Sequence, residues 1–134
     1  MKELRVVAAD DSLLIRDFLK RALSSIKSCN LVGLAAEGEE ALSLIRLLRP
    51  DVIVLDVSMP LKNGIQVLRE VRQEDFDVII IMFTGDTTPE LKRLCLEAGA
   101  NYFVNKGEFR MLSAILTQLQ QQSCVRVNDQ CVNS

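Results

Sequence analysis

Five polar residues in this sequence of 134 residues could together carry out one kind of chemistry: Asp10, Asp11, Asp56, Thr84 and Lys106. Thr84 follows Asp56 by 28 residues, and Lys106 follows Thr84 by 22. Three carboxylates in one pocket would repel one another unless a cation compensates their charge. Mg²⁺ suits such a site, because it binds through few protein oxygens and takes phosphate oxygens as well. With a hydroxyl and an ammonium group nearby, these residues favour phosphoryl transfer onto an aspartate.

The composition excludes several other functions. The sequence contains no histidine, so it cannot form a histidine-based nucleophile system, a His-containing zinc site or a phosphohistidine. Its net charge of −2 argues against a broad surface for nucleic acid. No apolar run reaches the roughly 18 residues of a membrane span, and the first residues lack the apolar core of a signal peptide. We therefore expect a cytoplasmic protein that itself binds neither nucleic acid nor membrane.

Two kinds of segment alternate along the chain and would position these side chains. Short runs rich in Val and Ile, three of them apolar without alternation, are typical of parallel strands covered on both faces. Segments with apolar residues at helical spacing follow each run. The predicted strands are Val6–Ala9, Leu31–Ala36, Val52–Leu55, Val78–Phe83 and Tyr102–Val104. The predicted helices are Ser12–Ser25, Glu39–Leu48, Ile65–Arg72, Pro89–Ala98 and Phe109–Gln121.

Apolar side chains indicate which face of each predicted helix packs on the sheet. We assign to that face Leu14, Phe18, Leu19 and Ala22 of the first helix, and Leu91, Leu94, Cys95 and Ala98 of the fourth. Lys92, Arg93 and Leu96 fall outside the core face of the fourth helix, and Met111 and Ile115 fall partly outside that of the fifth. Asp11 or Ser12 can cap the first helix, and Thr88 stands where it can cap the fourth.

Strict alternation of five strands and five helices predicts an α/β fold with a parallel sheet. The expected form is a flavodoxin-like (βα)5 three-layer sandwich with strand order 2-1-3-4-5. In that order the first, third, fourth and fifth strands are neighbours, and they end at Asp10, Asp56, Thr84 and Lys106. Open α/β sheets bind ligands beyond the carboxyl ends of their strands. The fold therefore predicts that the polar residues form one site.

With its polar residues placed in this way, the chain resembles the receiver domain of bacterial two-component response regulators, from about Leu4 to Leu119. The motifs that carry the resemblance are Asp10-Asp11, DVIVLDVSMP at 51–60 with its Met59-Pro60, Gly64, FTGD at 83–86, and Lys106. Five residues of the required types in the required order, on alternating strands, are a specific match.

The resemblance implies a role for each residue of the site. Asp56 would be the phosphoacceptor. Asp10 and Asp11 would bind Mg²⁺ together with Asp56 and the backbone carbonyl of Ser58. Lys106 would pair with the phosphoryl group.

Further residues would act as the switch. Thr84 would move towards the phosphoryl oxygens, and Phe103, three residues before Lys106, would then turn inward. Tyr102 stands one position too early for that role. Ser58 and Asp86 occupy positions that would tune the lifetime of the phosphorylated state.

One departure from the family concerns the residue after Lys106. Many receivers have a proline there, in a cis bond, whereas this chain has Gly107. We therefore expect the loop after the fifth strand to be more mobile.

The resemblance also implies partners. The phosphoryl group would come from a sensor histidine kinase or a histidine phosphotransfer protein. The chain would assist its own phosphorylation and dephosphorylation and would otherwise not be an enzyme. It would signal through the face formed by the fourth helix, the fifth strand and the fifth helix, which could also form a homodimer. An alternative is that it is the receiver fragment of a DNA-binding transcriptional regulator.

Three other functions fit less well. An aspartyl-phosphate phosphatase of the haloacid-dehalogenase kind carries an acid two residues after its nucleophile, where this chain has Ser58. An FMN-binding flavodoxin needs a phosphate loop rich in glycine and hydroxyl groups after the first strand, where this chain has Asp10-Asp11. A degenerate receiver that acts only as an interaction module would be expected to lack some of the site residues.

The sequence predicts one receiver domain over residues 1–122. Residues 123–134 are expected to be a polar tail or the start of a linker. The cysteines Cys29, Cys95, Cys124 and Cys131 are expected to be free thiols, because none forms a CxxC pair and nothing indicates an oxidising compartment.

Overall fold

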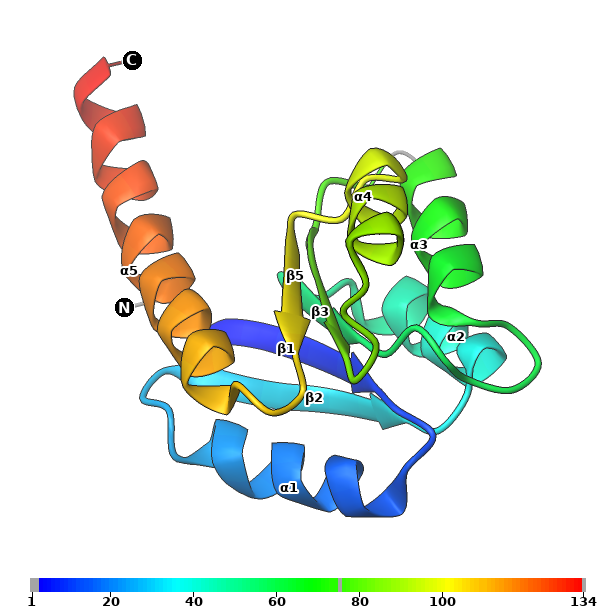
Figure 1. Ribbon diagram of the computed structural model, residues 1–134. Coiled ribbons are helices and arrows are strands. Elements are labelled where there is room, and N and C mark those ends of the chain that lie inside the picture. The colour runs from blue at the N-terminus through cyan, green and yellow to red at the C-terminus, as the bar shows by residue number, and fades with distance from the viewer. Residues whose placement is uncertain (1–2, 75, 134) are drawn as a thin grey trace.

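A computed structural model describes residues 3–74 and 76–133 of the chain, and the side chains up to Gln122 (Figure 1). Its sheet has five parallel strands in the order β2-β1-β3-β4-β5. The strands are β1 (Leu4–Ala9), β2 (Cys29–Ala35), β3 (Val52–Leu55), β4 (Ile79–Thr84) and β5 (Tyr102–Asn105). The helices are α1 (Leu13–Ser24), α2 (Gly38–Leu48), α3 (Gly64–Gln73), α4 (Pro89–Glu97) and α5 (Phe109–Asn133). The predicted flavodoxin-like fold and strand order are confirmed.

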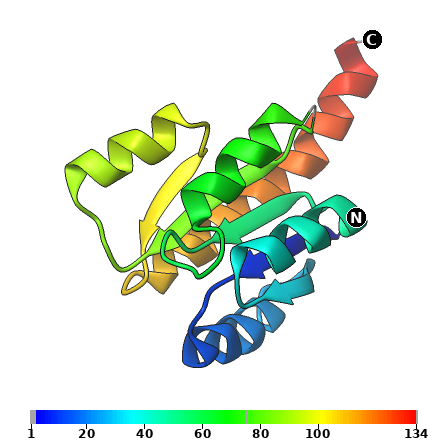
Figure 2. The same ribbon diagram turned by 90° about the vertical axis from the view of Figure 1, so that its right-hand side faces the viewer.

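Helices cover both faces of the sheet, so the domain has three layers (Figures 1 and 2). Helices α2, α3 and α4 pack on one face around side chains such as Leu42, Leu68 and Cys95. Helices α1 and α5 pack on the other face around Leu19 and Leu112. The middle strand β3 is buried along its whole length, as its continuous apolar sequence predicts.

The predicted core face of α1 is partly wrong. Leu19 is buried as expected, but Leu14 is 81% exposed and Phe18 is 42% exposed. The row that faces the sheet is Ile15, Leu19 and Leu23, one position further around the helix. Both rows repeat every four residues and both are apolar, so helical spacing alone could not select between them.

The predicted core face of α4 is wrong at Leu94, which is 40% exposed. Cys95 is fully buried, and Leu91 and Ala98 pack beside it. Leu96, Lys92 and Arg93 are exposed, as predicted.

The helix caps follow the sequence in part. Ser12 is the N-cap of α1 and accepts a hydrogen bond from the Ile15 N–H. Thr88 is the N-cap of α4, but its side chain makes no capping hydrogen bond.

Helix α5 is longer than predicted: the apolar pattern ends at Gln121, whereas the helical backbone continues to Asn133. Among the side chains that the structure describes, Leu112, Leu116 and Leu119 of α5 pack in the core on this face of the sheet. The division into a receiver over 1–122 and a tail or linker over 123–134 stays a prediction. Cys29 and Cys95 are free thiols, as expected, whereas Cys124 and Cys131 lie outside the described side chains. Within residues 3–74 and 76–133, no helix has the length and apolar character needed to span a membrane.

Candidate functional site

The register of the central strands places Asp10 beside Asp56. Ala9 of β1 pairs with Leu55 of β3, so the next residues leave adjacent strands side by side. The Asp56 N–H donates to the Ala9 carbonyl at 3.0 Å, and the Asp10 N–H donates to the Ala35 carbonyl at 3.1 Å. Backbone hydrogen bonds of the sheet therefore hold both aspartates at its carboxyl edge.

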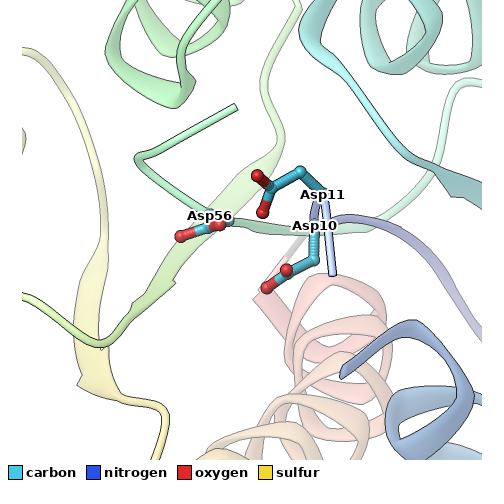
Figure 3. Close-up of side chains that lie close together, drawn as sticks. All are labelled: Asp10, Asp11 and Asp56. Atoms are coloured by element: carbon cyan, nitrogen blue, oxygen red, sulfur yellow. The ribbon is translucent and has the colours of Figure 1, made fainter. Parts of the chain in front are cut away.

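Three carboxyl groups gather at this edge, from Asp10, Asp11 and Asp56 (Figure 3). One oxygen from each lies within 4.8 Å of the others. Asp10 is 0% exposed and Asp56 is 3% exposed, whereas Asp11 is exposed. Two of the three carboxyl groups are therefore buried, and the third faces solvent.

Lys106 supplies the cation of this cluster. Its Nζ lies 2.7 Å from Asp10 Oδ2 and 3.2 Å from Asp56 Oδ2. Burial by itself lowers the pKa of Lys106, but the two carboxylates outweigh burial and raise the pKa above its usual value. Lys106 is therefore held in its charged form.

The Asp56 carboxyl group has a raised pKa. Burial is the largest cause and the charge of Asp10 is the second. Lys106 and a hydrogen bond from the Ser58 backbone N–H act in the opposite direction and do not compensate. The cluster therefore holds more negative charge than Lys106 alone balances.

This excess charge fits a metal ion. Asp10 Oδ2 is buried and receives no well-directed hydrogen bond from any described residue, although Lys106 is near it. Asp10 Oδ1 accepts from the Ser12 N–H at 2.9 Å, which orients the carboxyl group. Convergent carboxylate oxygens that outnumber the one cation beside them are the ligand type that a hard divalent cation such as Mg²⁺ takes. The acidic pocket could therefore bind a metal.

Gly64 lets helix α3 begin close to Asp56. A Cβ atom at Gly64 would lie 2.0 Å from the Asp56 carbonyl oxygen, which is far inside van der Waals contact. The Gly64 N–H donates to the Val57 carbonyl at 2.8 Å. Glycine is needed here because the helix start packs directly on the backbone of the site.

Thr84 lies at the end of β4 next to Lys106, whose backbone N–H donates to the Thr84 carbonyl at 3.0 Å. The Thr84 side chain is buried, and its hydroxyl oxygen accepts from the Asp86 N–H at 3.3 Å. The Asp86 carboxylate in turn accepts from the Thr88 N–H at 3.2 Å. The structure thus brings Thr84 to the predicted edge, with its hydroxyl held by its own loop.

Comparison with known proteins identifies the family. The family model described as "Response regulator receiver domain" matches residues 6–120. The chain belongs to this family. It is a receiver domain of two-component signalling, a phosphoacceptor switch, as the sequence predicted.

Relatives of this receiver domain include longer proteins. The protein-glutamate methylesterase/protein-glutamine glutaminase of Bacillus subtilis (strain 168) is 38% identical over 126 residues, which cover 92% of this chain and 35% of that protein. The chain spans about a third of the length of the methylesterase relatives that it matches.

Solved structures agree with the assignment. The signal receiver domain of the response regulator NarL from Mycobacterium tuberculosis superposes with a TM-score of 0.81 at 36% identity, covering 87% of this chain and 95% of that one. A CheX-CheY-BeF3-Mg+2 complex from Borrelia burgdorferi gives a TM-score of 0.73 at 29% identity, covering 78% of this chain and 79% of that one.

The two aromatic residues of β5 in this receiver point to opposite sides of the sheet. Phe103 packs against the cluster on the side of α2, α3 and α4, whereas Tyr102 packs against the cluster on the side of α1 and α5. Phe103 is half-buried, so its ring is neither free in solvent nor enclosed in the core. The structure therefore places Phe103, and not Tyr102, on the side of α4.

Sequence reasoning missed two residues of the receiver site. Arg16 of α1 donates from Nη1 to the Asp10 carbonyl at 2.9 Å and so ties the helix to the site backbone. Asn105 and Gly107 flank Lys106, and the Asn105 side chain accepts a hydrogen bond from the Gly107 N–H at 2.7 Å. The Asn-x-Gly spacing around Lys106 is a turn signal that could have drawn attention to Asn105.

Proposed function

We propose that Asp56 is the phosphoacceptor of this receiver domain. The observation that carries the proposal is the position of its carboxylate. It is 3% exposed, stands at the end of the central strand β3, and has Lys106 Nζ at 3.2 Å. Asp11 is exposed, and Asp10 has its Oδ1 engaged by the Ser12 N–H. Asp56 is therefore the carboxylate best placed to receive a phosphoryl group beside Lys106.

The donor would be a phosphohistidine on a partner, because this chain has no histidine. In the transfer, the P–N bond of the donor breaks and a carboxylate oxygen of Asp56 forms the new P–O bond. The leaving imidazole of the donor keeps the electron pair of the broken bond. Lys106 would compensate the charge on the phosphoryl oxygens, since phosphoryl transfer depends on positioning and neutralisation. A sensor histidine kinase or a histidine phosphotransfer protein is the expected partner.

Mg²⁺ is the proposed cofactor. Asp10, Asp11 and Asp56 would hold it, with the backbone carbonyl of Ser58 as a further ligand. When bound, the metal supplies positive charge that offsets the three carboxylates and the incoming phosphoryl oxygens. The related CheX-CheY-BeF3-Mg+2 complex from Borrelia burgdorferi includes Mg+2, which supports this choice of metal.

Thr84 and Phe103 are the proposed switch. The Thr84 hydroxyl would leave the Asp86 N–H, its present donor, and turn towards the phosphoryl oxygens. That movement would pull the loop between β4 and α4, and Phe103 would turn inward on the same side of the sheet. The face formed by α4, β5 and α5 would change as a result.

The same face is the proposed surface for signalling and for a homodimer. Its two helices carry exposed apolar side chains, including Leu96 of α4 at 41% and Met111 of α5 at 48% exposure. Exposed apolar side chains are common where a surface contacts another protein.

Ser58 and Asp86 are proposed to set the lifetime of the acyl phosphate. Both side chains are exposed, and they stand two residues after Asp56 and Thr84. They could therefore contact water approaching the phosphoryl group.

The output of the switch is a separate proposal. The chain spans about a third of its methylesterase relatives, so it could act alone or belong to a longer regulator, such as a DNA-binding one. Its cytoplasmic location stays a prediction, as does the absence of nucleic-acid and membrane binding by this chain.

The test of the phosphoacceptor is a mass measurement with Mg²⁺ and acetyl phosphate. The native chain should gain one phosphoryl group, and Asp56→Asn should gain none. The matched control is Asp77→Asn, because Asp77 is an exposed aspartate that precedes β4 at the opposite edge of the sheet. A native chain that gains no mass, or an Asp56→Asn variant that still does, would overturn the proposal.

A further inference from the structure

Asn105 occupies a position that links two loops of the site. It is the last residue of β5 and directly precedes Lys106. Its carboxamide oxygen accepts from the Gly107 N–H at 2.7 Å, and its carboxamide nitrogen lies 3.5 Å from the Thr87 hydroxyl oxygen. The first contact is a short, normal hydrogen bond, whereas the second is at the limit of hydrogen-bond distance and is weak.

The strong contact fixes the backbone around Lys106. The Glu108 N–H donates to the Asn105 carbonyl at 2.9 Å, and the Lys106 N–H donates to the Thr84 carbonyl at 3.0 Å. Together with the hydrogen bond from the Gly107 N–H, these bonds hold the backbone both before and after Lys106 in one turn. An asparagine side chain that bonds the backbone two residues ahead is a recognised way to order a turn.

Gly107 contributes to this turn through its N–H group. A proline at this position would have no N–H to donate. A Cβ atom at Gly107 would lie 3.1 Å from the Asn105 carboxamide oxygen, which is a tight contact. Glycine therefore supplies the donor and leaves room for the carboxamide.

We propose that Asn105 is a positioning residue for phosphorylation. It orders the turn that holds Lys106 next to Asp10 and Asp56. This inference rests on the proposed function of Lys106 and deepens it. Asn105 touches none of the reacting groups. It acts through the backbone of Lys106, and its effect should disappear when the Lys106 ammonium is removed.

The first test measures initial rates of phosphorylation by acetyl phosphate at saturating Mg²⁺. Loss of one hydrogen bond in Asn105→Ala should slow the rate by about 2- to 10-fold. Asn105→Ser should restore much of the rate, because a serine hydroxyl can accept from the same N–H. Thr87→Val removes only the weak contact and should leave the rate within about 2-fold of the native value.

A double-mutant cycle separates positioning from a general loss of structure. In a Lys106→Met background, Asn105→Ala should cause no further slowing, whereas a structural role would slow both backgrounds equally. Equal slowing in the two backgrounds, or a native rate in Asn105→Ala, would overturn the proposal.

A second measurement keeps the inference testable if the chain accepts no phosphoryl group from acetyl phosphate. In NMR spectra with Mg²⁺ absent, Asn105→Ala should speed exchange of the Gly107 amide and shift the Lys106 side-chain resonances. Unchanged Gly107 exchange and Lys106 resonances would overturn the positioning role. A native chain that gains no phosphoryl group while these signals respond would overturn only the proposed phosphoacceptor function.

Discussion

Two clusters of charged side chains in this protein differ in burial. At the carboxyl edge of the sheet, Asp10 and Asp56 are 0% and 3% exposed and share Lys106. Between α2 and α3, Arg46 and Lys62 pair with acidic side chains, and every member of that cluster is between 27% and 55% exposed. The acidic side chains of the second cluster are Glu39, Glu70 and Glu74.

Exposure to water decides how much free energy an ion pair costs when the chain folds. Water solvates the exposed cluster, so each pair changes little in free energy when the chain folds. The buried cluster has lost that solvation and contains more carboxylates than ammonium groups. The raised pKa of Asp56, caused first by burial and then by Asp10, is the sign of that cost. A bound metal ion could supply the positive charge that these carboxylates lack.

The largest expected effect comes from removing the cation of the buried cluster. Lys106→Met leaves Asp10 and Asp56 facing each other without a positive charge, and this should lower the free energy of unfolding by about 3 kcal/mol. Urea unfolding in Mg²⁺-free buffer measures the change. Lys92→Met is the control, because Lys92 is an exposed lysine of α4 and should cause little change. If Lys106→Met lowers the free energy of unfolding by less than about 1 kcal/mol, then solvent already stabilises the charges of the two carboxylates, and this view of the cluster is wrong.

Removing a carboxylate from the same cluster should have the opposite sign. Asp56→Asn should raise the free energy of unfolding at neutral pH without Mg²⁺, because it removes a carboxylate whose charged form burial and Asp10 disfavour, as the raised pKa of Asp56 shows. Saturating Mg²⁺ should shrink the difference, since the metal stabilises the native carboxylates and binds the variant less well. An Asn variant that is less stable than the native protein without Mg²⁺ would contradict this view of the cluster.

The pH dependence of the same comparison follows from linkage. Because folding raises the pKa of Asp56, the folded chain binds its proton more tightly than the unfolded chain does. The native protein should therefore gain stability relative to Asp56→Asn as the pH falls through the raised folded pKa towards the unfolded value. Unfolding curves of both proteins between neutral and mildly acidic pH measure the gain. A native protein that loses stability relative to the variant over this range would reverse the assigned shift.

Much of the fold and of the site could be predicted because the signals are local. Continuous apolar runs indicate buried parallel strands. The strand order then predicts which of the residues that follow these strands lie side by side at the carboxyl edge of the sheet. Asp10, Asp56 and Lys106 meet as predicted because β1, β3 and β5 all end at one edge.

The errors arise where two local patterns compete. In α1, the row of Leu14 and Phe18 is as apolar as the row of Ile15 and Leu19, and only the packing on the sheet selects the second. Asn105 was missed for a different reason: the Asn-x-Gly spacing signals a turn, but only the structure shows the hydrogen bond from the Gly107 N–H to Asn105 that spans Lys106.

The smallest expected effect belongs to the exposed cluster. Arg46 donates to Glu74 at 2.9 and 2.7 Å and lies 3.6 Å from Glu70, yet its side chain is 49% exposed. Arg46→Gln should therefore move the Tm by no more than about 2 °C, similar to Arg69→Gln on the exposed side of α3. Any difference between the two variants should vanish in high salt, where exposed pairs are screened. If Arg46→Gln instead destabilises the protein as much as Lys106→Met does, then hydrogen-bond geometry outweighs exposure, and the contrast between the clusters fails.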